Sequence, residues 1–166
     1  MIVVLRVLAL LLLTLVAVSV LWILFVNLTG REKSMWYGGR PSSLGLKNGK
    51  LSGPKTTPNS VVSEGVDASH PAYIAAIAFS GDPTAAWAKL RTVIDSLDRV
   101  TLVGADSNYL YAEFRSAKLQ YVDDFEARLD PNAGVIHVRS ASRLGRRDFD
   151  VNRARVEMIR KKFSAG

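Results

Sequence analysis

Residues 109–160 decide the fold of this chain and contain YLYAEFRS (109–116), YVDDFEARL (121–129) and VIHVRSASRLGRRDFDVNRARVEMIR (135–160). Charges recur at nearly every second position of the first two segments and of the start of the third. Because side chains alternate between the two faces of a strand, this spacing predicts three strands with one apolar and one charged face. Short connections between them favour hairpins, and a basic helix is expected from about residue 151 to 163.

Regular structure is expected to begin earlier, at about residue 72. Residues 73–79 form a short apolar run that fits a buried strand, and Asp82-Pro83 predicts the N-cap and first position of a helix. A further short strand is expected at residues 101–104. The resulting order, β-α-β-β-β-β-α, predicts an α+β fold in which helices pack on one face of an antiparallel sheet. Asp150 is the expected cap of the last helix.

An apolar segment lies near the N-terminus. Residues 7–26 contain only Thr14 and Ser19 as polar members, and a helix of this length spans roughly 30 Å, the thickness of a hydrocarbon core. A cleavable signal has a shorter apolar run and small residues at its cleavage site. Here the chain continues as NLTGR (27–31), so we interpret the segment as an uncleaved, single-pass transmembrane anchor. Charge counting leaves its orientation open, because Arg6 precedes the segment and the following charges are Arg31, Glu32, Lys33 and Arg40.

The sequence therefore divides into three parts. Residues 1–30 are the predicted membrane anchor, residues 31–71 an irregular lead-in rich in Gly and Pro, and residues 72–166 the α+β domain. The chain has no cysteine, which excludes disulfides, cysteine nucleophiles and zinc–thiolate sites.

One face of the predicted sheet collects charged side chains. We expect this face to be solvated, with cross-strand pairs that contribute roughly 0.2–1 kcal/mol each. The alternative is an enzyme, hydrolase-like, in which Asp124 and Glu126 act as acid and base beside Arg115 and Arg139. The charged residues of this face are Glu113, Arg115, Asp124, Glu126, Arg128, His137 and Arg139.

Asp123 is out of place, because alternation puts it on the apolar side of its strand. An unpaired carboxylate there would be costly, so we expect a structural buried charge whose partner is Arg143, Arg153 or a backbone amide. Since Asp123 faces away from Asp124 and Glu126, these carboxylates do not form a hard-cation site. The sequence thus predicts no metal site. It also lacks a Gly-rich phosphate loop and a Gly-x-Ser-x-Gly nucleophile, and it predicts no cofactor.

The C-terminal part is strongly basic. Residues 143–162 hold eight Lys and Arg against three acidic residues, which accounts for +5 of the formal net charge of +7. Such a segment attracts anionic lipid or nucleic acid, or is simply solvated. Nucleic acid is not favoured, because Phe149 is the only aromatic platform within the segment. The candidate binding residues are Arg115, Arg139, Arg143, Asn152, Arg153 and Arg155.

Several motifs occur in a fixed order: YAEFRS (111–116), VDDFE (122–126), IHVRSASRLG (136–145), and Asp148 followed by VNRxR (151–155). With these motifs the chain resembles the DUF1499 family, a domain of unknown function, over about residues 43–163. The resemblance implies an N-terminal signal or anchor and no established activity. The family's lead-in resembles Cys-Pro followed by Pro-Asn-Cys-Val, and Gly53 and Ser60 stand at those cysteines here.

A cysteine pair suits an oxidising compartment, so the resemblance implies an exported domain. In this chain packing and hydrogen bonds must hold the lead-in instead. Together, these patterns lead us to expect a membrane-anchored, non-enzymatic binding or envelope-associated domain on the periplasmic or outer side. Its partner would be anionic, either lipid headgroups or an envelope protein, held by the charged sheet face and residues 143–155.

Overall fold

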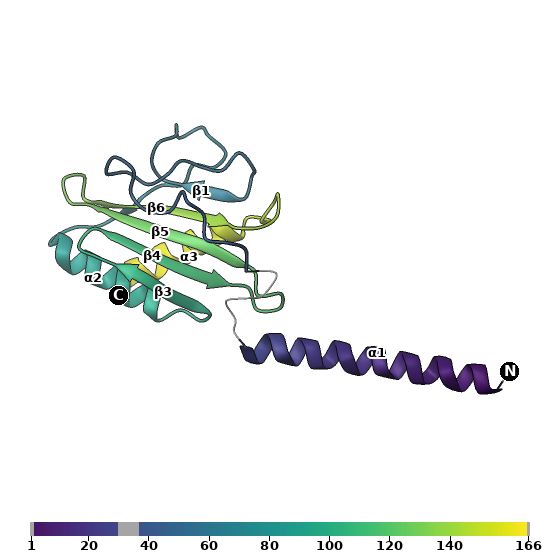
Figure 1. Ribbon diagram of the computed structural model, residues 1–166. Coiled ribbons are helices and arrows are strands. Elements are labelled where there is room, and N and C mark those ends of the chain that lie inside the picture. The colour runs from purple at the N-terminus through teal and green to yellow at the C-terminus, as the bar shows by residue number, and fades with distance from the viewer. Residues whose placement is uncertain (1, 30–36, 166) are drawn as a thin grey trace. The chain divides into compact units, whose positions relative to one another are not determined.

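The computed structural model describes residues 2–29 and 37–165 (Figure 1). It divides into two compact units, Met1–Tyr37 and Gly38–Gly166. In the first unit, helix α1 (Ile2–Thr29) contains the span Arg6–Phe25, whose mean hydropathy is 2.9. This helix is long and apolar enough to cross a membrane, and a signal sequence has the same character. The flanking charges Arg31, Glu32 and Lys33 lie outside the described residues.

The two polar side chains of this apolar span are satisfied within the helix. The hydroxyl of Thr14 donates to the carbonyls of Leu10 and Leu11, and that of Ser19 donates to the carbonyl of Leu15. Neither hydroxyl therefore needs a partner from lipid, which is what a hydrocarbon surrounding requires.

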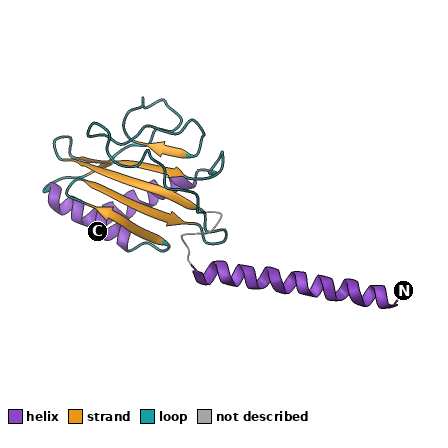
Figure 2. Cartoon of the chain, in the orientation of Figure 1, coloured by secondary structure: helices purple, strands orange, loops and turns teal. Residues whose placement is uncertain are grey.

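The second unit contains one antiparallel sheet, which confirms the α+β class (Figure 2). Its strand order is β1-β6-β5-β4-β3, and β2 also pairs with β6. The elements in chain order are β1 (Ser60–Val62), β2 (Ile77–Ala78), α2 (Pro83–Asp95), β3 (Val100–Ala105), β4 (Tyr109–Arg115), β5 (Val122–Asp130), β6 (Val135–Ser142) and α3 (Val151–Ala165).

The apolar face of the sheet meets both helices, as the alternation predicts. Figure 1 shows α2 and α3 on one side of the sheet, and residues of the segment 38–53 contact its other face. Burial of this apolar area is the main favourable term in folding. The core joins side chains of both helices to those of the three long strands: Trp87, Leu90, Ile94, Val156, Ile159 and Phe163 with Leu110, Ala112, Phe114, Phe125, Ala127, Leu129, Ile136 and Val138.

Local sequence determines where the helices begin. The carboxylate of Asp82 accepts hydrogen bonds from the backbone amides of Thr84 and Ala85, and Pro83 opens α2, as expected. At α3 Asp150 directly precedes the helix, as expected, and its carbonyl accepts from the amide of Ala154. The carboxylate that accepts from the amide of Asn152 belongs instead to Asp148, and Asp150 has a positive φ of 63°.

Two further differences concern the edge of the sheet. The apolar run 73–79 contributes only Ile77–Ala78 as a strand. Its earlier residues are tied to the lead-in instead, since Ile74 N–H donates to the carbonyl of Val62. The lead-in also contains β1, which pairs with β6. A strand of only three residues within a Gly- and Pro-rich segment is too short to show an alternation of apolar and polar residues, so the sequence did not predict β1.

Candidate functional site

The charged face of the sheet is buried, which overturns the expectation of a solvated face. The exposed fractions are 1% for Glu113, 1% for Asp124, 0% for Glu126 and 3% for Arg139. The cause is the lead-in, because residues 38–58 run across this face and bring backbone groups to it (Figure 1). We refer to residues 38–58 as the cover.

Glu126 is the centre of the first group beneath the cover. Strand register places it directly opposite Arg139, whose Nη1 donates to Oε2 of Glu126 at 2.9 Å. The other oxygen, Oε1, accepts from the amide of Gly45 and from the hydroxyl of Tyr109, both at 2.8 Å. Burial, reinforced by the charge of Glu126, raises the pKa of Tyr109, so its hydroxyl remains a donor. Arg139 Nε completes the group by donating to the carbonyl of Gly53 at 3.2 Å.

Arg143 is the centre of the second group. The register sets Glu113 opposite Asp124, and two carboxylates so placed repel each other unless a cation lies between them. Arg143 Nη2 supplies it, 2.5 Å from Glu113 Oε1 and 2.7 Å from Asp124 Oδ1. Tyr111 donates to Asp124 at 2.6 Å, and burial raises the pKa of its hydroxyl.

The cover closes the second group as well. Arg40 Nε donates to Glu113 Oε1 at 2.8 Å, and Arg143 Nη1 donates to the carbonyl of Gly38 at 3.3 Å. Arg115 lies at the edge of this group, 3.9 Å from Glu113 and 14% exposed. Asp124 and Glu126 thus belong to separate groups, each held by its own arginine.

Asp123 has a different partner from those expected. Its Oδ2 accepts from Arg155 Nη2 at 2.5 Å, whereas Arg143 serves the opposite face and Arg153 donates to the carbonyls of Tyr73 and Pro71. Helix α3 packs on the face that carries Asp123, so a helix residue is the one that can reach it. The side chain of Asp123 is 13% exposed.

Asn152 connects the helix to the sheet. It is fully buried, and its Nδ2 donates to the carbonyl of Asn59, to Ser142 Oγ and to Asp148 Oδ2. Its Oδ1 accepts from Ser140 Oγ and from Arg155 Nη1. The motif residues at 59, 148, 152 and 155 therefore form one hydrogen-bonded network.

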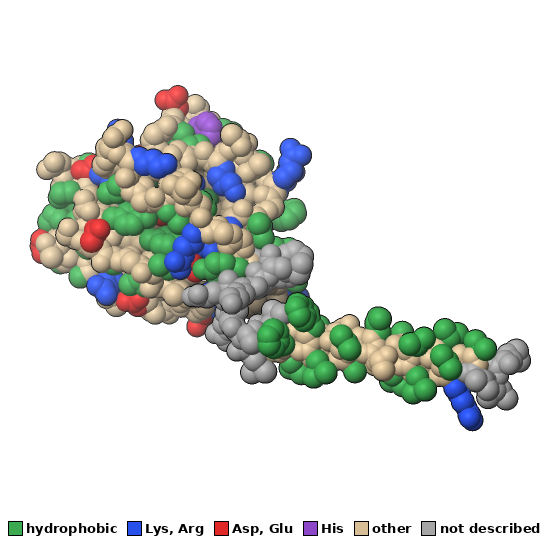
Figure 3. All heavy atoms as spheres, in the orientation of Figure 1, with side chains coloured by type: hydrophobic (Ala, Val, Ile, Leu, Met, Phe, Trp, Pro, Cys, Tyr) green, Lys and Arg blue, Asp and Glu red, His purple; other side chains and the backbone are tan. Residues whose placement is uncertain are grey.

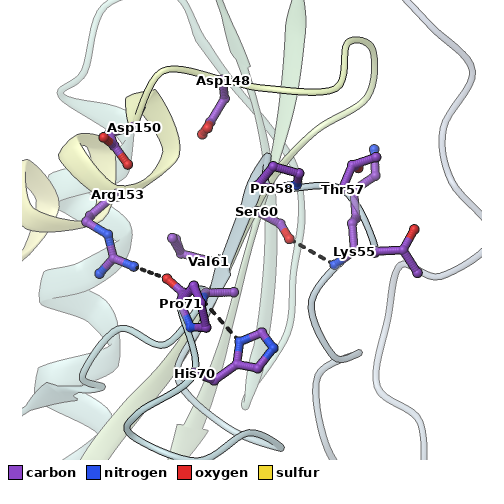
Figure 4. A pocket seen from close by; sticks show the side chains of 12 residues that line it. Lys55, Thr57, Pro58, Ser60, Val61, His70, Pro71, Asp148, Asp150 and Arg153 are labelled. Atoms are coloured by element: carbon purple, nitrogen blue, oxygen red, sulfur yellow. Dashed lines mark hydrogen bonds between the residues drawn. The ribbon is translucent and has the colours of Figure 1, made fainter.

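A cavity of about 430 Å³ lies between the lead-in and the start of α3 (Figure 4). On one side Ser60 Oγ accepts the backbone N–H of Lys55, and on the other Arg153 donates to the carbonyl of Pro71. Burial, and then the charge of Arg139, lowers the pKa of Lys55, whose Nζ donates to the carbonyl of Ser142. Within residues 2–29 and 37–165, no three His, Asp or Glu side chains are grouped so as to hold a metal ion.

Residues 144–150 form an exposed turn that sequence reasoning undervalued, and we call it the basic turn. Phe149 is 89% exposed, and Arg146 and Arg147 are exposed beside it. Phe149 also has a positive φ of 52°, an uncommon conformation for a bulky residue. Asn59 Nδ2 fixes the turn by donating to the carbonyl of Gly145 at 2.7 Å.

Residues 50–163 match a family described as a protein of unknown function, DUF1499. The chain belongs to the DUF1499 family. No curated protein matches it. In this DUF1499 chain the match begins at Lys50, within the cover. It includes the strand and helix residues of the Glu126, Arg143 and Asn152 groups, but not Gly38, Arg40, Gly45 or α1.

Proposed function

We propose that this DUF1499 domain is a non-enzymatic binding domain that contacts anionic lipid headgroups through its basic turn. The supporting observation is the combination of a largely exposed Phe149 with two exposed arginines on a turn that hydrogen bonds hold in place. An aromatic ring favours the interfacial region of a bilayer, and arginines favour anionic headgroups. Among the described residues of this domain, Phe149 is the most exposed large apolar side chain.

The sheet face contributes structure to this proposal rather than binding. Arg139 and Arg143 are buried and donate hydrogen bonds to Glu126, Asp124 and Glu113. Apart from Arg40, which is 49% exposed beside Glu113, the exposed cations lie outside these groups, and they include Arg146, Arg147 and those toward the C-terminal end of α3. The space-filling view shows Lys and Arg side chains scattered over the visible face rather than gathered in one patch (Figure 3).

Lipid is the partner that the rest of the chain favours. Helix α1 can hold the protein at a bilayer, and in the sequence only residues 30–37 connect it to the second unit. Such a tether gives the domain a high effective concentration at the membrane, so a weak contact is enough. We place the domain on the extracytoplasmic side, by analogy with the cysteine pair of its relatives.

The enzymatic alternative gains no support from the contacts. Asp124 and Glu126 are buried under the cover, and each is engaged by an arginine and a tyrosine. A carboxylate that acts on a substrate must reach it. The proposed function therefore assigns these two carboxylates to holding the cover and gives them no catalytic role.

The lipid proposal is tested with the full chain in nanodiscs. Because the chain has no cysteine, Phe149→Cys gives a single position for an environment-sensitive fluorophore. Ala133→Cys, in the exposed turn between β5 and β6, is the matched control. With about 30% anionic lipid we expect a blue shift at position 149 and none at position 133. The shift should weaken with salt, since exposed charges are screened.

Charge neutralisation gives the quantitative test. Each arginine near an anionic surface contributes about 1 kcal/mol, so neutralising Arg146 and Arg147 should weaken the docked state about 30-fold. The double variant Arg146→Gln/Arg147→Gln should therefore lose most of the shift. Equal shifts in zwitterionic and anionic nanodiscs would contradict the proposal, and so would a shift unchanged in the double variant.

A further inference from the structure

Exposed apolar side chains of the second unit gather at one end of the sheet. The register sets Arg115, where β4 ends, opposite Val122, where β5 begins. Ser142, where β6 ends, lies opposite the next residue of β5. The turns that follow β4 and β6 therefore lie at the same end of the sheet (Figure 1). Of the six exposed large apolar side chains within residues 38–165, four belong to these turns or directly follow them: Leu119, Leu144, Phe149 and Val151.

Residues 116–121 connect β4 to β5, and we call them the hairpin turn. Leu119 is 53% exposed there and follows the exposed Lys118. Hydrogen bonds hold the turn, because Ser116 N–H donates to the carbonyl of Tyr121 at 2.9 Å and Gln120 Nε2 donates to the carbonyl of Ser116 at 3.2 Å. An apolar side chain beside a cation suits the boundary between headgroups and acyl chains, where the apolar group is buried and the cation faces the headgroups.

The exposed charges at this end favour an anionic surface. The turn that follows α2 lies at the same end, since β3 begins opposite Phe114. Four exposed cations face two exposed acids in the three turns, which gives +2: Arg99, Lys118, Arg146 and Arg147 with Asp98 and Asp150. The half-buried Asp148, which accepts two hydrogen bonds from Asn152, would reduce this to +1. Lys118 therefore adds a positive charge that the basic turn does not contain.

The path of the chain points to the same end independently of exposure. In the sequence only residues 30–37 lie between α1 and the second unit. The carbonyl of Gly38, the first residue of that unit, accepts from Arg143 Nη1 at 3.3 Å. Arg143 directly precedes the basic turn, so the chain from the apolar helix enters the domain beside that turn. A tether favours contact between the membrane and the surface at which the tether enters.

We propose that this end of the sheet is a bilayer-contact surface, in which Leu119 enters the interfacial region together with Phe149 and Lys118 faces anionic headgroups. The inference rests on the proposed function and adds a second point of contact, which orients the domain with its strands pointing away from the membrane. β4 has seven residues, and seven residues of a strand extend over roughly 23 Å. The turn between β3 and β4, at the other end of the sheet, therefore stays clear of the bilayer.

The test uses single cysteines in the full chain, each carrying the same environment-sensitive fluorophore, in nanodiscs with about 30% anionic lipid. Leu119→Cys reports on the hairpin turn, and Phe149→Cys reports on the proposed function itself. Ser107→Cys is the matched control, because it is exposed in the β-hairpin turn at the other end of the sheet. We expect a blue shift at positions 119 and 149 and none at position 107. A nitroxide on the upper acyl chain of the lipid should quench the same two positions.

Charge variants test the contact a second time, with the fluorophore at position 149. Lys118→Gln should lower the ratio of docked to undocked domain about fivefold, the value expected for one cation at an anionic surface. Lys162→Gln makes the same change near the end of α3, where Phe163 and Ser164 lie beside Ala78. Ala78 pairs with Val135 at the beginning of β6, so this control lies at the other end of the sheet and should leave the ratio unchanged.

The outcomes separate this inference from the proposed function. A shift at position 149 without one at position 119 overturns the inference and leaves the lipid contact of the basic turn in place. A shift at neither position overturns both. The inference is also overturned by an equal shift at position 107, or by a loss of docking in Lys118→Gln no larger than that in Lys162→Gln.

Discussion

Removal of Arg139 would break an almost completely buried ion pair beneath the cover. Arg139 and Glu126 are 4% and 0% exposed and lie 2.9 Å apart. Loss of one partner of a buried pair costs about 3–5 kcal/mol, because the other charge stays buried without compensation. Glu126 would keep two neutral donors, Gly45 N–H and the hydroxyl of Tyr109. We therefore expect Arg139→Met to lower the free energy of unfolding by about 3 kcal/mol, near the lower end of that range.

The measurement is urea unfolding of the full chain in detergent micelles, followed by circular dichroism. With an m-value of about 2 kcal/mol/M, a loss of about 3 kcal/mol lowers the urea midpoint by about 1.5 M. Arg91→Met is the matched control, because the Arg91–Asp95 pair is 59% and 52% exposed and 4.0 Å apart. Exposed pairs of this kind contribute about 0.5 kcal/mol or less, so this midpoint should move by less than about 0.25 M.

A double variant separates buried charge from lost packing. In Glu126→Gln/Arg139→Met the amide oxygen can still accept from Gly45 and Tyr109, and no charge is left buried without a partner. The double variant should therefore be more stable than Arg139→Met alone, by about 1–2 kcal/mol. The reasoning is refuted if Arg139→Met costs no more than Arg91→Met, or if the double variant is less stable than either single one.

Three other predictions follow from the fold. Burial alone would raise the pKa of Glu64, but hydrogen bonds from Arg128 and from the amide of Leu51 outweigh the effect of burial, so the pKa is lowered. The ionised Glu64 therefore stabilises the fold above about pH 4.5, and this contribution is lost as the pH falls. Glu64→Gln should make the decline of the urea midpoint between about pH 7 and 3 shallower, and an unchanged decline would contradict this. Gly38→Ala should lower the free energy of unfolding by about 1–2 kcal/mol, since Gly38 has a φ of 64° and an added Cβ would lie 3.0 Å from Arg143 Cβ. Gly39→Ala is the control and should be near neutral, because its Cβ would meet no atom within 4 Å. Equal effects of the two substitutions would show that neither the positive φ nor the close contact of Gly38 matters. A reporter active only outside the cytoplasm, fused after the C-terminus, should be active, and activity only of a cytoplasmic reporter would refute the proposed topology.

The sequence predicts which face of each strand a side chain occupies, but not what lies over that face. Alternation correctly separates Leu110, Ala112 and Phe114 from Tyr111 and Glu113. The cover itself is invisible to periodicity, because it contacts the face through backbone groups of glycines such as Gly45 and Gly53. Backbone donors and acceptors are the same at nearly every residue and leave no trace in composition.

Two signs in the sequence do point toward burial. The face carries tyrosines beside its acids, and Tyr109 and Tyr111 can donate to a carboxylate that water does not reach. The partner of Asp123 could also be found from helix spacing. If Val156 and Ile159 face inward, residues one turn earlier share that face, and these are Asn152 and Arg155.

The buried charges determine how the cover is placed rather than how strongly the sheet is held. The cover has little apolar area to bury, and Leu51 is its only buried large apolar residue within 38–58. Ionic and backbone hydrogen bonds are directional, so the Glu126 and Arg143 groups can bond to the cover in only one alignment of its residues over the sheet. Asn59 follows the cover and donates to the basic turn while accepting from Asn152. A displaced cover would therefore disturb Asn59 first, and through it both the turn that carries Phe149 and the network that holds Arg155.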